Sequence, residues 1–217
     1  PLNDADKTAA SGTIGLGGVQ MFYADMREPV SDIRGDIAFN NGGVTAQQLS
    51  AGFQGLNLAA RIEPRAQTHG VVVADFPYAP DAQGGGVSSY IPELIRNALA
   101  GESRWHAELP LGVENTELAL SSDLRGTSLG MPAPLGKAAD AAAPIRITIG
   151  GGVPDGTRVR VGYDNRLAAD LAMRQPVVAD AGKQAVAAAP AGMVMRSASL
   201  QLGGGTPQPV QEGIALA

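Results

Sequence analysis

The fold is decided by residues 145–174, IRITIGGGVPDGTRVRVGYDNRLAADLAMR. This stretch holds three segments in which apolar and polar residues alternate with a period of two, which is the periodicity of a β-strand with one apolar and one solvated face. The first segment places Ile145, Ile147 and Ile149 on one side. A turn signal, Pro154-Asp155-Gly156, separates it from the second. The stretch therefore predicts an antiparallel meander with one dry face.

The turn at Asp164-Asn165 decides how the second and third segments pair. A two-residue loop would place Leu167 on the same face as Arg160. A three-residue loop over 164–166 pairs Tyr163 with Leu167 and keeps both apolar sets together. We therefore expect the longer loop.

The same alternation continues outward along the chain. It occurs over 33–39, 56–62 and 105–111. In two places the apolar residues switch between odd and even positions, with Gly55 or Gly126 at the switch. A bulge at each glycine would restore a single apolar face and bend the strand. We expect a mainly β fold, an antiparallel, strongly curved and twisted meandering sheet that forms an open β-groove.

One short amphipathic helix is predicted near 90–100. Ser88 or Ser89 can cap it, Pro92 fits its first turn, and an apolar stripe precedes Gly101. We expect it to cover part of the dry face. Residues 1–11 are expected to be a flanking segment of a longer chain. Residues 12–213 would form a single β-rich domain, with a helical insertion over about 88–100 and a low-complexity connector over 138–143.

Composition excludes several classes of function. The 217 residues include 29 Gly and 15 Pro, which disfavour a helical bundle because both destabilise helix interiors. The net charge is −5 and the Lys and Arg residues are scattered, so the basic stripe of a nucleic-acid-binding protein is missing. No apolar run approaches the roughly 18 residues of a membrane-spanning helix. The sequence contains no cysteine for disulfides or thiolate metal sites, and nothing indicates a cofactor.

A catalytic serine is the sharpest alternative. Residues 126–130, GTSLG, match the nucleophile-elbow pattern of α/β-hydrolases at Ser128. That triad needs a histidine after the serine, but His69 and His106 both precede it. Prolines rather than a helix follow the motif. We interpret the match as chance and the two histidines as polar surface residues, with no metal site expected.

The apolar face itself has two interpretations. It can be an ordinary core, closed by the helix or by a second sheet, since most apolar faces are buried. It can instead stay open as a groove for an apolar ligand. Few aromatic and many aliphatic residues suit a smooth lining for acyl chains, which form no hydrogen bonds. Composition does not separate the two.

A longer motif brings in a known family. Residues 121–126, SSDLRG, lead into residues 129–137, LGMPAPLGK. This resembles the signature of the YhdP family, large AsmA-like, TamB-type envelope proteins of Gram-negative bacteria. There, a strand ending in Asp-Leu-x-Gly leads into a Leu-Pro-x-Pro-Leu-x-Lys loop, and Met131 here replaces the usual Leu. The motif residues are Asp123, Gly126, Pro132, Pro134, Leu135 and Lys137. Weaker pieces in the family's order extend the resemblance over roughly 12–213.

The resemblance implies a central portion of an inner-membrane-anchored protein that reaches across the periplasm. In such proteins a long curved sheet is thought to carry phospholipid in an apolar groove between the inner and outer membranes, in support of outer-membrane integrity. The implied partners are phospholipid acyl chains and neighbouring segments of the same longer chain, with no nucleic acid and no membrane span within this piece. The family has no catalytic residues, so no enzyme is expected. The alternative is a closed β-scaffold or interaction domain without lipid conduction.

The expected groove lining comes from the alternation and not from a family motif. It comprises apolar residues on four successive segments: Leu118, Leu120, Leu124, Ile145, Ile147, Ile149, Val159, Val161, Leu167, Leu171 and Met173.

Overall fold

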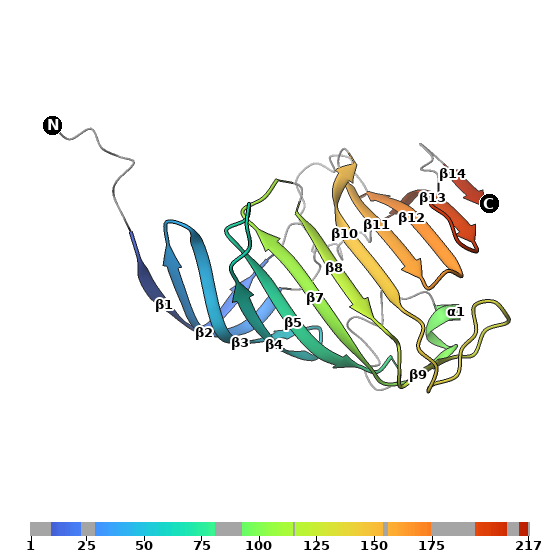
Figure 1. The fold of residues 1–217 in the computed structure, drawn as a ribbon, viewed down its shortest axis with the longest axis horizontal. Coiled ribbons are helices and arrows are strands. Elements are labelled where there is room, and N and C mark those ends of the chain that lie inside the picture. The colour runs from blue at the N-terminus through green and yellow to red at the C-terminus, as the bar shows by residue number, and fades with distance from the viewer. Residues whose placement is uncertain are drawn as a thin grey trace, which may run out of the picture.

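The computed structural model describes residues 10–22, 29–80, 93–114, 116–153, 156–174, 194–207 and 213–216. In these ranges twelve strands form one long sheet and two short strands form a second (Figure 1). The long sheet contains β1 (Gly12–Met21), β2 (Val30–Asn40), β3 (Gly43–Phe53), β4 (Leu56–Glu63), β5 (Gly70–Tyr78), β7 (Ser103–Leu111), β8 (Glu117–Ser122), β10 (Ile145–Val153), β11 (Gly156–Tyr163), β12 (Leu167–Arg174), β13 (Val194–Leu202) and β14 (Gly213–Leu216). The second sheet contains β6 (Leu99–Gly101) and β9 (Thr127–Leu129).

Strand order in the long sheet follows chain order, so the sheet is a meander. Every pair is antiparallel except the last, in which β13 and β14 run parallel. The predicted mainly β, antiparallel, open sheet is confirmed. The expected three-residue loop is also confirmed, because Tyr163 pairs with Leu167.

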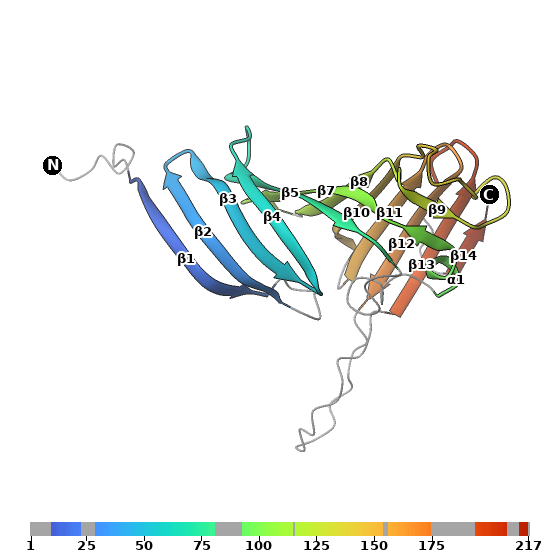
Figure 2. The same ribbon diagram turned by 90° about the horizontal axis from the view of Figure 1, so that it is seen from below.

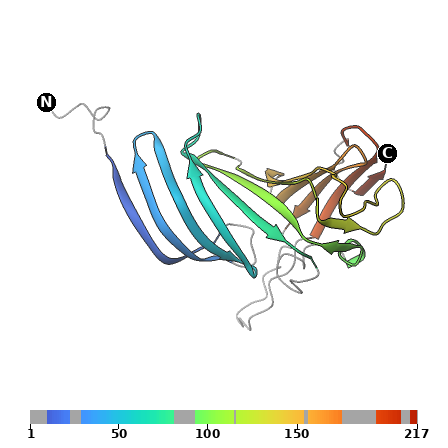
Figure 3. The ribbon, with the colours of Figure 1, turned by 60° about the horizontal axis from the view of Figure 1, so that its bottom comes forward.

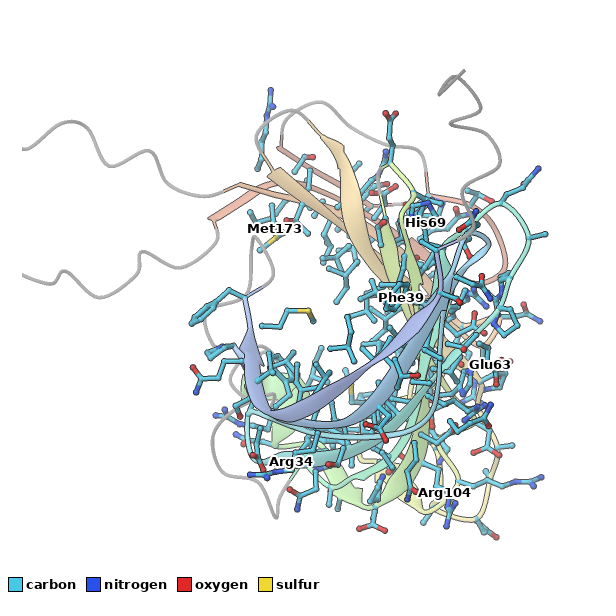
Figure 4. The ribbon with its side chains drawn as sticks, turned by 90° about the vertical axis from the view of Figure 1, so that its left-hand side faces the viewer. Arg34, Phe39, Glu63, His69, Arg104 and Met173 are labelled. Atoms are coloured by element: carbon cyan, nitrogen blue, oxygen red, sulfur yellow. The ribbon has the colours of Figure 1, made fainter. Side chains whose placement is uncertain are left out.

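Bulges bend the first four strands. The pairing of β1 with β2 shifts register next to Gly18, whose φ is +90°. The pairing of β2 with β3 shifts on both sides of Gly35, where a Cβ would overlap the backbone of β3. Each extra residue increases the local twist and bends the strand. These irregularities account for the strong curvature of β1 and β2, seen end-on in Figure 4.

The two bulges predicted from sequence are wrong, because both glycines lie in turns. Gln54 and Gly55 both have positive φ and form a two-residue hairpin turn in which Phe53 pairs with Leu56. Gly126 lies in the turn between β8 and β9, which belong to different sheets. The hairpin restores a single apolar face as a bulge would have done, by pairing the residues on either side of it.

The long sheet twists strongly along its length. Seen from below, β1–β4 lie broadside while β5, β7 and β8 lie nearly edge-on (Figure 2). Accumulation of twist from strand to strand is the expected behaviour of an open sheet. Figure 3 shows the sheet from an intermediate angle, with the first and last strands at its two free edges.

Within the described residues, the predicted helix covers a single turn. Helix α1 covers Glu93–Arg96, and residues 99–101 form strand β6 instead. Residues 88–92 of the expected helix lie outside the described residues. The pairing of Leu99 with Leu129 explains the difference, because a contact distant in sequence overrides local helix propensity. Within the described ranges, no helix has the length and apolarity needed to cross a bilayer.

Candidate functional site

An unbroken row of apolar residues and glycine crosses all twelve strands of the long sheet. Residues that pair directly across neighbouring strands point to the same face. The register links one residue from each strand in turn: Leu16, Gly35, Leu49, Ala60, Ala74, Ala107, Leu120, Ile147, Val161, Ala169, Leu200 and Leu216. We call the side of the sheet that carries this row the apolar face.

The row is flanked by further apolar residues on the same face. Leu118 pairs with Ile149, which pairs with Val159, and Val159 pairs with Leu171. In the other half of the sheet, Ile62 pairs with Val72, which pairs with Leu109. The apolar face is therefore a band several side chains wide.

The opposite face of the sheet is polar and carries most of the ion pairs. On β11 and β12, Arg158 holds Asp170 through two hydrogen bonds of 2.8 and 2.6 Å. On β4 and β5, Arg61 contacts Asp75 at 3.2 Å. Figure 4 shows Arg34, Glu63 and Arg104 on this outer side, whereas Phe39 and Met173 lie on the inner, concave side. The curvature of the sheet thus puts apolar side chains inside and charges outside.

The apolar face is only partly covered by protein. Its central side chains on β8, β10 and β11, such as Leu120, Ile147 and Val161, are half-buried and not enclosed. Two small clusters of buried residues lie on it in the described part of the chain, one around Ala46, Leu49 and Ile62, and one at the end of β10 and β11. No second sheet of comparable size packs against it in the described ranges.

Ten of the eleven predicted lining residues lie together on this face. They belong to β8, β10, β11 and β12, and all ten are half-buried: Leu118, Leu120, Ile145, Ile147, Ile149, Val159, Val161, Leu167, Leu171 and Met173. Leu124 differs from them. It lies in the turn after β8 with a φ of +52°, and it is only 6% exposed. Contact of the ten other residues with a ligand stays a prediction.

Leu124 belongs to a cover over one end of the apolar face. The segment 123–143 folds back onto the ends of β7, β10, β11 and β12, and we call it the wall. Its apolar residues pack with strand residues of the apolar face in one cluster: Leu124, Leu129, Leu135 and Ala143 with Trp105, Ile145, Tyr163 and Leu167. Figure 1 shows α1 and β9 beyond the lower ends of β7 and β10. The connector predicted over 138–143 is part of this wall, and Ala143 is fully buried.

Polar contacts fix the wall to the sheet. The Lys137 ammonium, 8% exposed, donates hydrogen bonds to the carbonyl oxygens of Leu124 and Thr127. The Tyr163 hydroxyl donates to the Leu135 carbonyl at 3.0 Å. Burial lowers the pKa of Lys137, with partial opposition from nearby carboxylates, and burial raises the pKa of Tyr163. These neutralising shifts are the expected response of ionisable groups in a dry environment.

The comparisons identify the family. A family model described as YhdP protein matches residues 1–208, nearly the whole chain. The chain belongs to the YhdP family. Comparison with curated proteins gave no match, and comparison with solved structures gave none either. The resemblance carried by the proline-rich motif is therefore confirmed.

The YhdP motif residues build the wall. Asp123 accepts a hydrogen bond from the Arg125 backbone amide at 3.0 Å, and its own carbonyl accepts one from Ala143 at 2.9 Å. Gly126 has a φ of +92° and lies where a Cβ would overlap the Glu102 carbonyl oxygen. The Pro132 carbonyl accepts from the Leu135 and Gly136 amides, which closes the loop that also contains Pro134. The motif residues therefore have structural roles.

The serine and the two histidines considered for catalysis each contact different residues and do not contact one another in the interactions described. The Ser128 hydroxyl donates to the Ala100 carbonyl at 3.3 Å. His106 is hydrogen-bonded to Asp75 at 2.8 Å on the polar face, and the His69 ring packs against Gly112. In the described part of the chain, no three His, Asp or Glu side chains group as metal ligands.

A hollow of about 1200 Å³ lies at the ends of β5, β7, β8, β10 and β11. Its lining includes Asp75, His106 and Arg146. Asp75 is already paired with His106 and with Arg61, so its charge is balanced inside the protein. This hollow offers mixed charge and selects no ligand class.

The prediction from sequence missed about half of the apolar face. Its lining residues stopped at β8, although the alternation over 33–39, 56–62 and 105–111 had the same form. The register shows that these segments belong to the same row as Leu120 and Ile147. The signal was present, and extending it only required that the whole chain form one sheet.

Proposed function

We propose that this YhdP-family chain is a segment of a periplasmic, inner-membrane-anchored protein whose apolar face holds phospholipid acyl chains in transit between the inner and outer membranes. On this proposal it contributes to outer-membrane integrity and acts without catalysis. The supporting observation is the row of apolar residues and glycine that crosses all twelve strands. A continuous path of this kind runs across the strands, in the direction along which a lipid would move.

Physical chemistry favours a hydrocarbon occupant. The exposed part of the half-buried aliphatic side chains would gain about 25 cal/mol for each Å² removed from water by a bound chain. Acyl chains form no hydrogen bonds, and the side chains of the row contain no hydrogen-bond donor or acceptor. The charged residues lie on the other face, as Arg34 and Glu63 illustrate (Figure 4). Affinity would therefore come from apolar contact spread along the band, which suits a ligand that slides.

The test is lipid capture by the purified chain. Lipid extracts analysed by mass spectrometry should contain phospholipid from the wild-type chain. In Ile147→Asp an unpaired carboxylate would face the acyl chains at a cost of several kcal/mol, so capture should be lost. Thr148→Asp is the matched control, because Thr148 pairs with Ala119 and Arg160 on the outer face. This control should retain lipid.

The scaffold alternative gives different results. A wild-type chain that is purified without lipid, and that takes up no fluorescent phospholipid, would contradict the proposal. A dye for exposed apolar surface then separates the two cases, since a closed scaffold should bind little of it and an open apolar face should bind it strongly. Equal capture by the Ile147→Asp and Thr148→Asp variants would also contradict the proposal.

A further inference from the structure

The apolar face has two unlike ends along β7–β11. At one end the wall, segment 123–143, packs on Trp105, Ile145 and Tyr163. At the other end lie the last residues of β7 and the first of β8, joined by a connection in which Gly112 and Glu114 are exposed to solvent. We call this second end the solvent end. An amphiphile that lies along the strands would therefore meet different chemistry at each end.

The cations at the contact between the wall and the sheet are already committed to protein groups. The Lys137 ammonium is committed to the carbonyls of Leu124 and Thr127. The Arg166 guanidinium donates to the Gly136 carbonyl at 2.9 Å and contacts Asp164 at 3.0 Å. A phosphate placed against Lys137 or Arg166 would lose its hydration without gaining a free cation, which is strongly unfavourable.

The wall is also apolar where it meets the face. Leu124 and Tyr163 pack inside this contact, whereas Trp105, Ile145 and Leu167 are only half-buried and keep part of their apolar surface open. Such a surface suits the methyl end of an acyl chain. At the solvent end, by contrast, a headgroup beyond Leu118 and Ile149 would remain in water.

We propose that the wall orients the bound amphiphile. Its hydrocarbon chain ends lie against Trp105 and the wall, and its polar headgroup lies at the solvent end beyond Ile149. This inference rests on the proposed function, because it requires a lipid on the apolar face. It adds that the lipid lies along the strands in one orientation, and that the wall carrying the YhdP motif sets that orientation.

Trp105 provides a native probe, because it is the only tryptophan of the chain. The purified protein is loaded with one of three labelled phosphatidylcholines. Two carry a bromine quencher on the acyl chain, either near its methyl end or near the ester, and the third carries a spin label on the headgroup. Loss of Trp105 fluorescence should be largest for the chain-end quencher and smallest for the headgroup quencher. A double variant, Trp105→Phe with Ile149→Trp, moves the probe to the solvent end, and the order of quenching should reverse.

Each outcome decides one proposal. Mass spectrometry first shows whether lipid is bound. If lipid is bound and the quenching order is the same at both probe positions, or the headgroup label quenches Trp105 most, the orientation is overturned and the proposed function stands. Opposite orders at the two positions support it. No lipid bound to the wild-type chain overturns the proposed function, and the orientation with it. The Trp105→Phe variant alone, tested for lipid content, shows whether the probe change itself alters capture.

Discussion

The Lys137 ammonium lies 2.8 Å from the carbonyl oxygen of Leu124, a hydrogen bond between the end of the YhdP motif and its beginning. A lysine that is only 8% exposed and has no carboxylate in salt-bridge contact among the described residues is unusual. Its donors go to the backbone carbonyls of Leu124, in the turn after β8, and of Thr127, at the start of β9. The lysine therefore ties the two ends of the motif together where the chain leaves the long sheet to form the wall.

Replacing this lysine should loosen the wall. Lys137→Met keeps most of the aliphatic stem but removes both hydrogen bonds, which leaves the Thr127 carbonyl without its lysine donor and the Leu124 carbonyl with only the Thr127 amide at 3.2 Å. We expect a loss of about 1–3 kcal/mol in the free energy of unfolding, measured by urea denaturation. Arg125→Met is the control, because the Arg125 side chain is 68% exposed. Its effect should stay within about 0.5 kcal/mol. Equal effects of the two variants would argue against a bonding role for Lys137.

Gly126 should tolerate substitution less well than Gly55. Both have positive φ, so alanine costs about 1–2 kcal/mol of backbone strain at either position. At Gly55 nothing lies near a new Cβ, whereas at Gly126 the Cβ would overlap the backbone oxygen of Glu102. We therefore expect Gly126→Ala to lower the free energy of unfolding by more than Gly55→Ala. Thermal denaturation of both variants makes the comparison, and an equal loss would show that the contact at Gly126 relaxes freely.

The apolar face was predictable because its signal is local. Alternation with a period of two follows directly from strand geometry, so Ile145, Ile147 and Ile149 had to share a face once the segment was extended. The pairing of Tyr163 with Leu167 followed from the same rule, since a two-residue loop would have placed Leu167 on the same face as Arg160.

The wall was not predictable from pattern, because its contacts join residues distant in sequence. Nothing local indicates that Lys137 is buried, since lysine is usually exposed. The Tyr163 hydroxyl meets the Leu135 carbonyl across 28 positions. The two bulges wrongly predicted at Gly55 and Gly126 have a related cause. A positive-φ glycine serves a bulge or a turn equally well, and only the partner strand decides between them.

Acid should weaken the outer face. The pKa of the Asp75 carboxyl is lowered by its hydrogen bond with His106 and by Arg61, and the pKa of Glu108 is lowered mainly by Arg65. Because both folded-state values lie below the ordinary ones, the unfolded chain binds protons first as pH falls. These contributions are fully present above the ordinary pKa values of 3.8 and 4.5 and are lost as pH falls through the lowered values.

The check is the urea midpoint as a function of pH. It should be flat from neutral pH to about 5 and then fall. The double variant Asp75→Asn with Glu108→Gln removes both groups, so its midpoint should be lower at neutral pH and should fall less on acidification. Parallel curves for the two proteins would show that other carboxyls govern the acid response.

Three alanines follow one another near the middle of the row, Ala60, Ala74 and Ala107 on β4, β5 and β7. A large apolar side chain at these positions should obstruct the path of an acyl chain, and it does so without adding a charge to the apolar face. Ala107→Phe should therefore reduce phospholipid capture, measured by mass spectrometry, while the protein stays folded because the half-buried ring can extend into solvent. Ala119→Phe places the same ring on the outer face, since Ala119 pairs with Glu108, and it should leave capture unchanged. If both variants captured as much lipid as the wild-type chain, the acyl chains would not pass over the centre of the row.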